Sequence, residues 1–183
     1  MSKTYLDIDV LTAARQRVAT IFDHFETVVV SYSGGKDSAV LLELARQEAV
    51  WRDRQIYAIF IDLEAQYQHT IDQIEETMLD DPRIIPIWVC LPLNLRNAVS
   101  VFQPHWMCWN PEVEAHWVRP LPTHDCVVSD SSILPFWRDG MEFEEFIVEF
   151  PRFVVGSGDY ASLVAIRTDE SLNRFRAVMK KKN

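Results

Sequence analysis

The segment from residue 28 to residue 40, VVVSYSGGKDSAV, constrains the fold of this chain more than any other. β-Branched valines followed by glycines and then by renewed apolar spacing predict a buried strand, a tight turn and a helix. Glycine adopts backbone angles that are closed to other residues, so a glycine pair lets the chain turn sharply and lets a ligand approach the main chain. The segment therefore predicts a strand–turn–helix unit of an α/β domain.

The N-terminal half of the chain alternates between helical and strand patterns. Apolar residues recur at helical spacing over residues 10–25, from residue 38 onward and over residues 67–78, while residues 56–61 and 84–91 predict strands. Such alternation predicts right-handed crossovers. The expected fold is α/β, with a parallel twisted sheet that carries helices on both faces.

The C-terminal half is less regular. Residues 103–140 are rich in proline and lack periodicity, which predicts a long irregular insertion into a domain that includes all 183 residues. Apolar spacing after this insertion predicts a helix that stops near Pro151, because proline breaks helix interiors. Residues 162–166 predict a late strand, and residues 168–170 the first turn of a last helix. Pro86 indicates a bulge or an edge position in the third strand.

Charge and composition exclude several classes of protein. The net charge of −9 argues against nucleic acid as a direct partner, because phosphate backbones need clustered Lys and Arg. The apolar runs are too short for a membrane span, and the first residues lack the apolar core of a signal peptide. The three cysteines have none of the paired spacings of a disulfide framework. We therefore expect reduced thiols and a cytoplasmic protein.

The glycine turn has the residue types of a phosphate site. Its members are Ser33, Gly34, Gly35, Lys36, Asp37 and Ser38. The glycines expose the main chain, the following helix offers unpaired N–H groups and a positive dipole end, and the lysine adds a full charge. The turn is not a Walker A loop, which needs Gly in place of Val30 and Ser or Thr in place of Asp37.

Two carboxylates follow the second predicted strand. Asp62 and Glu64 should lie beside the glycine turn, because the carboxyl ends of parallel strands gather at one edge of a sheet. There they would contact a ribose or a Mg²⁺ ion, which binds through one or two carboxylates together with phosphates. The alternative is that they cap the next helix, and this alternative is as open for Glu64 as the functional one.

SGGKDS after a buried strand resembles the signature of the PP-loop superfamily, the adenine nucleotide α-hydrolases, which includes ATP pyrophosphatases and phosphoadenosine phosphosulfate (PAPS) reductases. AIRTDESLNRFR, residues 165–176, is similar to the late strand-to-helix motif of PAPS reductases. The resemblance implies Lys36 and Asp37 as catalytic residues and a second anionic group near Arg167, whose planar guanidinium holds oxygens bidentately. The nucleotide ligands that it implies are the six turn residues, Asp62, Arg167, Glu170, Ser171 and Arg174.

Segments such as DLEAQYQ and FQPHWMCWNPE resemble a PAPS-reductase-like subgroup that contains the immunoglobulin-binding regulator A protein. Relatives of this kind usually continue further, so a compact or truncated version is expected. The Glu-Cys-Gly-Leu-His element that carries the reductase cysteine is missing, which argues against sulfonucleotide reduction. The resemblance implies binding of ATP or PAPS and action at the α-phosphate or sulfonucleotide end. The alternative is a non-catalytic nucleotide sensor, a transcriptional co-regulator with a ParB-like partner.

The insertion also contains possible metal ligands and stacking residues. The metal candidates are His105, Cys108, His116, His124 and Cys126. All of them are competent zinc ligands, but their spacings differ from those of a finger or ribbon. Trp106, Trp109 and Trp117 would either stack on a nucleotide base or pack the insertion against the core.

Overall fold

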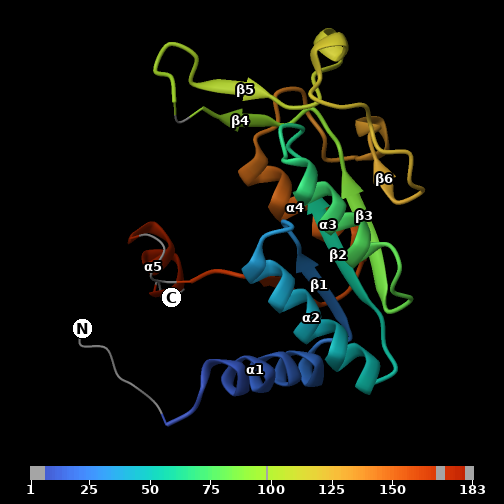
Figure 1. Cartoon of the computed structure of the whole chain (residues 1–183), viewed down its shortest axis with the longest axis vertical. Coiled ribbons are helices and arrows are strands. Elements are labelled where there is room, and N and C mark those ends of the chain that lie inside the picture. Colours follow the sequence, from blue (N-terminus) through green and yellow to red (C-terminus); the bar gives the residue numbers. More distant parts are fainter. Residues whose placement is uncertain (1–6, 98, 168–171, 180–183) are drawn as a thin grey trace.

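The computed structural model describes residues 7–97, 99–167 and 172–179. Its centre is a five-stranded sheet with the strand order β6-β3-β2-β1-β7, in which every pair of neighbours is parallel (Figure 1). The strands are β1 (Thr27–Ser31), β2 (Ile56–Ile61), β3 (Ile84–Val89), β6 (Val127–Val128) and β7 (Tyr160–Val164). The predicted α/β fold with a parallel sheet is confirmed.

Helices cover both faces of the sheet. The described helices are α1 (Val10–His24), α2 (Lys36–Trp51), α3 (Gln68–Met78), α4 (Phe143–Val155) and α5 (Leu172–Met179), of which α5 stands apart from the sheet in Figure 1. α2 and α3 connect strands that advance across the sheet in one direction, so right-handed crossovers place both on the same face. α4 leads back from β6 to β7 and covers the opposite face, while α1 packs beside α2. Among the helices within the described ranges, none has the length and apolar character that crossing a bilayer requires.

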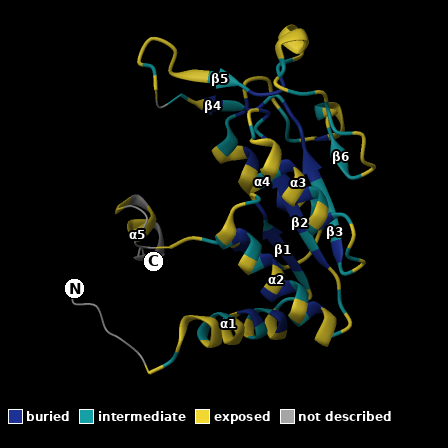
Figure 2. Ribbon diagram, viewed as in Figure 1, coloured by how far each residue is buried: buried dark blue, intermediate teal, exposed yellow. Residues whose placement is uncertain are grey.

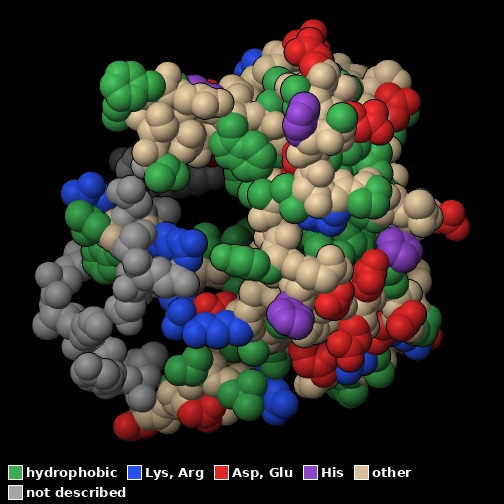
Figure 3. Space-filling view, turned by 45° about the horizontal axis from the view of Figure 1, so that its top comes forward, with side chains coloured by type: hydrophobic (Ala, Val, Ile, Leu, Met, Phe, Trp, Pro, Cys, Tyr) green, Lys and Arg blue, Asp and Glu red, His purple; other side chains and the backbone are tan. Residues whose placement is uncertain are grey.

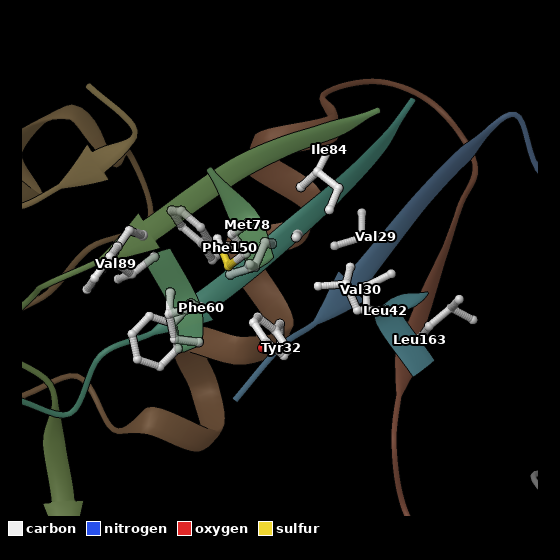
Figure 4. Packing of buried hydrophobic residues seen from close by; sticks show 14 of the residues in the cluster. Val29, Val30, Tyr32, Leu42, Phe60, Met78, Ile84, Val89, Phe150 and Leu163 are labelled. Carbon is white, nitrogen blue, oxygen red and sulfur yellow. The ribbon is translucent and has the colours of Figure 1, made fainter. Parts of the chain in front are cut away.

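The core lies between the sheet and these helices. Val28, Val29 and Val30 of β1 are all buried, because a parallel sheet with two covered faces needs apolar residues at consecutive positions. Figure 2 shows the buried residues concentrated in the strands and on the inner faces of the helices. Figure 4 shows Met78 of α3 and Phe150 of α4 among the side chains that pack there. Each such side chain stabilises the fold by about 1.5–3 kcal/mol.

The predicted stop of a helix near Pro151 is wrong. α4 continues through Pro151 to Val155 and ends at Gly156, whose φ of 74° is in the left-handed region that favours glycine. Phe146 and Phe150 of this helix are almost completely buried. Their packing offsets the hydrogen bond that proline removes, since most helix stability in proteins comes from the burial of an apolar face.

The third and last strands differ from the prediction in their ends. β3 stops at Val89, and β7 begins two residues earlier than expected and ends at Val164. The register with β2 runs unbroken through Pro86, so there is no bulge between these strands. β6 pairs only with the last two residues of β3. Within the described sheet, Pro86 therefore faces an edge that β6 does not cover, as the sequence indicates.

Residues 103–140 are mostly without regular structure, although they contain short elements. β5 (His105–Met107) pairs antiparallel with β4 (Asn94–Arg96) in a hairpin that projects from the body of the protein in Figure 1. Two 3₁₀ helices follow, η1 (Pro111–His116) and η2 (Ser131–Ile133). Strands of two or three residues are too short for an alternating pattern, which is why the sequence did not predict β4, β5 and β6.

Candidate functional site

A pocket of about 450 Å³ lies where the carboxyl ends of β1, β2 and β7 meet α4. Its walls include Ser33 and Ser38 of the glycine turn, Ile59 of β2, Phe143 and Ile147 of α4, and Arg174 of α5. The volume falls within the range of ligand pockets, and ligands of open α/β sheets bind at this edge. Polar groups at one side and an apolar wall at the other suit an amphipathic ligand.

The turn is held in shape by its two serines. The Ser38 hydroxyl donates to the Gly35 carbonyl at 2.8 Å, and it also accepts from the Ser33 N–H at 3.2 Å. The Ser33 and Ser38 hydroxyl oxygens are 3.0 Å apart. α2 begins at Lys36, two residues earlier than predicted, with Gly35 at the N-cap and no side-chain cap. The first turn of α2 therefore has backbone N–H groups that suit an anion.

The two glycines of the turn differ in whether their positions require a glycine. Gly34 has a φ of 72°, and a Cβ atom added to it would lie 2.7 Å from Cγ2 of Thr70 on α3. Both the backbone angle and the space therefore require glycine at this position. A Cβ atom on Gly35 would meet only the Ser33 hydroxyl, at an ordinary 3.4 Å. The turn is thus built directly against the first turn of α3.

An ion pair connects this turn with the segment after β7. Nε of Arg167 lies 3.1 Å from Oδ2 of Asp37. β1 and β7 are neighbouring parallel strands with Ser31 opposite Val164, so the segments that follow them leave the sheet side by side. The structure therefore brings Arg167 to the same end of the sheet as the turn. Arg174, which lines the pocket, lies at this end as well. In the space-filling view, Lys and Arg side chains gather around a hollow of the molecule (Figure 3).

Two of the predicted ligands, Glu170 and Ser171, lie outside the described residues. The remaining predicted ligands are all placed at the carboxyl edge of the sheet, and their assignment as nucleotide ligands stays a prediction.

Asp62 lies at this edge, but its carboxylate is completely buried and engaged by other protein groups. The guanidinium of Arg119 forms an ion pair with it, and the Trp88 indole N–H donates to it at 2.9 Å. The Glu64 backbone N–H also donates to it, at 2.8 Å. Asp62 therefore has a structural role, and its contacts give no support to binding of a ribose or of Mg²⁺.

Arg119, the ionic partner of Asp62, is a residue that the sequence did not indicate. It lies 57 positions after Asp62, within an irregular proline-rich segment that has no periodicity. Nothing local in the sequence marks it as the partner of a buried acid.

Glu64 also binds the insertion. Its side chain accepts hydrogen bonds from the backbone N–H of Trp109 at 2.7 Å and from that of Val118 at 3.3 Å. The helix-cap alternative is wrong, because α3 begins later, with Tyr67 at its N-cap. Glu64 has a φ of 64°, a left-handed conformation that is uncommon for residues other than glycine. Asp62 and Glu64 together fasten the insertion to the carboxyl end of β2.

The possible metal ligands do not converge. Cys108 is buried in the core, where its thiol donates to the Leu91 carbonyl at 3.3 Å. His124 instead pairs with Glu75 of α3 at 3.1 Å, and His105 lies exposed on β5. Over residues 7–97, 99–167 and 172–179, no group of three or more His, Cys, Asp or Glu is placed to hold a metal ion.

The tryptophans of the insertion serve packing. Trp109 is buried and packs edge-to-face on Trp117, with ring centroids 5.1 Å apart. The indole N–H of Trp109 donates to the Asp62 carbonyl at 2.8 Å, and the Arg119 guanidinium lies over its ring. These contacts favour the packing alternative for Trp109 and Trp117, since both rings already have a protein partner.

The cysteines are poor nucleophiles in this fold. Burial raises the pKa of the Cys108 thiol from its ordinary value of 9.0 to about 12. It raises the pKa of Cys90 and of Cys126 as well. Since the thiolate is the reactive form, none of these thiols has the lowered pKa of a catalytic cysteine.

This shift predicts how stability depends on pH. Above pH 9 the unfolded chain releases the Cys108 proton while the folded chain retains it, so the stability that this thiol contributes is lost as the pH rises toward 12. We expect wild type to be more stable than Cys108→Ala at pH 7, with a gap that narrows by about 1.4 kcal/mol for each pH unit above 9. Urea denaturation of both proteins at pH 7, 9 and 10 measures the gap. A constant gap would contradict the assignment.

Comparison with known proteins bears on the same region. Residues 27–80 match the family model of the phosphoadenosine phosphosulfate reductase domain. The match to this reductase domain spans β1, the glycine turn, α2, β2 and α3, and all of these except α3 contribute residues to the pocket wall.

A curated protein of Escherichia coli strain K12, the uncharacterized protein YbdN, is 38% identical to this chain over 178 residues. The aligned region covers 96% of this chain and 43% of YbdN. The chain thus spans less than half the length of this relative.

Proposed function

We propose that this protein is a PP-loop protein that binds an adenine nucleotide, ATP or PAPS, with the phosphates on the turn of residues 33–38. The observation that carries this proposal is the pocket that joins the serines of the turn to the apolar wall of α4 and to Arg174. The match to the PAPS reductase domain over the same turn supports it.

The chemistry of the pocket favours a nucleotide over a simple anion. Ile59, Phe143 and Ile147 provide an apolar surface for a flat base, and the turn with its lysine provides donors for phosphates. The whole chain carries a net charge of −9, so a polyanion needs this local concentration of cations and N–H groups. The second anionic group of the ligand would lie near Arg167 and Arg174.

The reaction that fits this arrangement is attack by an acceptor group on the α-phosphorus of ATP, in which the new bond forms as the bond to pyrophosphate breaks, or transfer of the sulfo group of a sulfonucleotide to an acceptor. Lys36 would stabilise the negative charge that develops on the phosphates. Cysteine attack on a sulfonucleotide is not part of the proposal, because the described thiols are held in the protonated form. Asp62 does not fit a Mg²⁺ site, because Arg119 occupies its carboxylate.

The finer placement, in the subgroup that contains immunoglobulin-binding regulator A, is also part of this proposal. It rests on the resemblance of segments such as DLEAQYQ and FQPHWMCWNPE. The test of turnover is incubation with ATP, and with PAPS in the presence of reduced thioredoxin as the electron donor, followed by assays for pyrophosphate and sulfite. Pyrophosphate release supports the enzyme. Tight binding without release of either product supports the nucleotide sensor with a ParB-like partner.

Replacement of Lys36 tests the binding site directly. Loss of a charge-assisted contact of about 1.5–3 kcal/mol should weaken ATP binding about tenfold to a hundredfold in Lys36→Ala. Isothermal titration calorimetry measures the affinity, and circular dichroism checks the fold. Arg17→Ala, which removes one positive charge from the exposed face of α1, is the matched control and should bind ATP as wild type does. Equal affinity in Lys36→Ala and wild type would remove the lysine from the site.

A further inference from the structure

We propose that Asp37 is a positioning residue that holds Arg167 beside the phosphate turn, and that it is neither a ligand nor a catalytic group. This inference rests on the proposed nucleotide site. It replaces the role that the resemblance implies for Asp37, and it starts from the 3.1 Å contact between Oδ2 of Asp37 and Nε of Arg167.

A carboxylate is an unfavourable direct contact for a polyanion. Asp37 is the second residue of α2, within the turn on which the phosphates are expected. Two like charges 4 Å apart repel each other by about 4 kcal/mol near a protein surface. An acidic residue at this position is therefore compatible with phosphate binding only if a cation offsets its charge, and the guanidinium of Arg167 lies in the right place to do so.

The contact also determines how the arginine is oriented. Arg167 follows β7, beyond the last residue of the sheet, and its side chain is 58% exposed. An exposed arginine loses considerable conformational entropy when a ligand orders it. The contact between Asp37 and Nε of Arg167 fixes the plane of the guanidinium and the direction of its two terminal nitrogens. The arginine is therefore partly ordered before the ligand binds, and less conformational entropy is lost on binding.

Stability is a weaker explanation of the same contact. Both side chains are partly exposed, at 58% and 35%, and ion pairs of this kind contribute little to folding. The contact joins the turn after β1 to the segment after β7, which are the two segments expected to hold the ligand. Its expected effect is therefore on ligand affinity.

The sign of one substitution separates positioning from simple proximity. If Asp37 only lay near the phosphates, Asp37→Asn would remove a repulsive charge and raise the affinity for ATP. If Asp37 positions Arg167, the same substitution should lower the affinity, by about threefold to tenfold. In an Arg167→Ala background, Asp37→Asn should then leave the affinity unchanged or raise it, because no arginine is left to position.

The experiment is calorimetric titration of ATP into wild type, Asp37→Asn, Arg167→Ala and the double variant. Glu43→Gln removes one negative charge from the same helix, where Glu43 pairs with Arg46, and is the matched control with unchanged affinity. Asp37→Glu, which retains the charge, should recover part of the loss. A second measurement, the solvent exchange of the Arg167 Nε–H by ¹⁵N NMR, should show faster exchange in Asp37→Asn than in wild type.

The outcomes distinguish this inference from the proposed function. Higher affinity in Asp37→Asn, or an equal loss with and without Arg167, would overturn the positioning role while ATP binding itself stands. Absence of ATP and PAPS binding in wild type would overturn the proposed function and this inference with it.

Discussion

Arg119→Ala is expected to lower the free energy of unfolding by about 3–5 kcal/mol, the usual effect of removing one partner from a buried ion pair. The Asp62 carboxylate is fully buried, and Arg119 is its only cationic partner among the residues the structure describes. Without the guanidinium, a charge would stay in the core with only hydrogen bonds to compensate it. Urea denaturation followed by circular dichroism measures the loss.

The control is a surface pair of similar geometry. Arg83 and Asp53 lie 2.7 Å apart, but Asp53 is 89% exposed, so Arg83→Ala should cost no more than about 1 kcal/mol. Adding Asp62→Asn to Arg119→Ala removes the uncompensated charge and should recover part of the stability. Similar losses in Arg119→Ala and Arg83→Ala would show that the buried pair contributes no more than a surface one.

Gly34→Ala is expected to destabilise the fold by about 2–5 kcal/mol and to weaken nucleotide binding at the same turn. The left-handed backbone costs about 1–2 kcal/mol for a residue with a side chain. The new methyl group, 2.7 Å from Cγ2 of Thr70, forces a shift of the turn or of α3, and overpacking of this kind costs about 1–3 kcal/mol more. Thermal denaturation and ATP titration are the two measurements.

Gly140 offers a control that separates the two costs. It has the same φ of 72°, but a Cβ atom added there meets nothing within 4 Å. Gly140→Ala should therefore show the backbone cost alone and leave ATP affinity unchanged. Equal losses of stability in the two alanine variants would show that the close contact with Thr70 adds no cost to the backbone one.

The part of the fold that the sequence predicts well is the run from α1 to β3. There the periodicity changes between helical and strand patterns over segments of at least five residues, and turn residues separate them. The glycine turn and the position of the site followed from one rule, that parallel strands place their carboxyl ends at the same edge.

The remaining errors come from interactions between distant parts of the chain. α4 passes through Pro151 because buried phenylalanines hold it, and β6 exists because two residues of the insertion reach the edge of β3. The ion pair between Arg119 and Asp62 likewise joins residues that are far apart in the sequence. Local propensity has no access to such contacts, so a single sequence predicts the acid at the sheet edge and misses the base that neutralises it.

The contact between Gly34 and Thr70 has a mechanical consequence. A Cβ atom on Gly34 would lie 2.7 Å from Cγ2 of Thr70, so the space between the glycine turn and the first turn of α3 is too small for a methyl group. Close-packed groups transmit displacements because they cannot be compressed. A ligand that shifted the turn would therefore also shift the start of α3, the helix whose Glu75 pairs with His124 of the insertion.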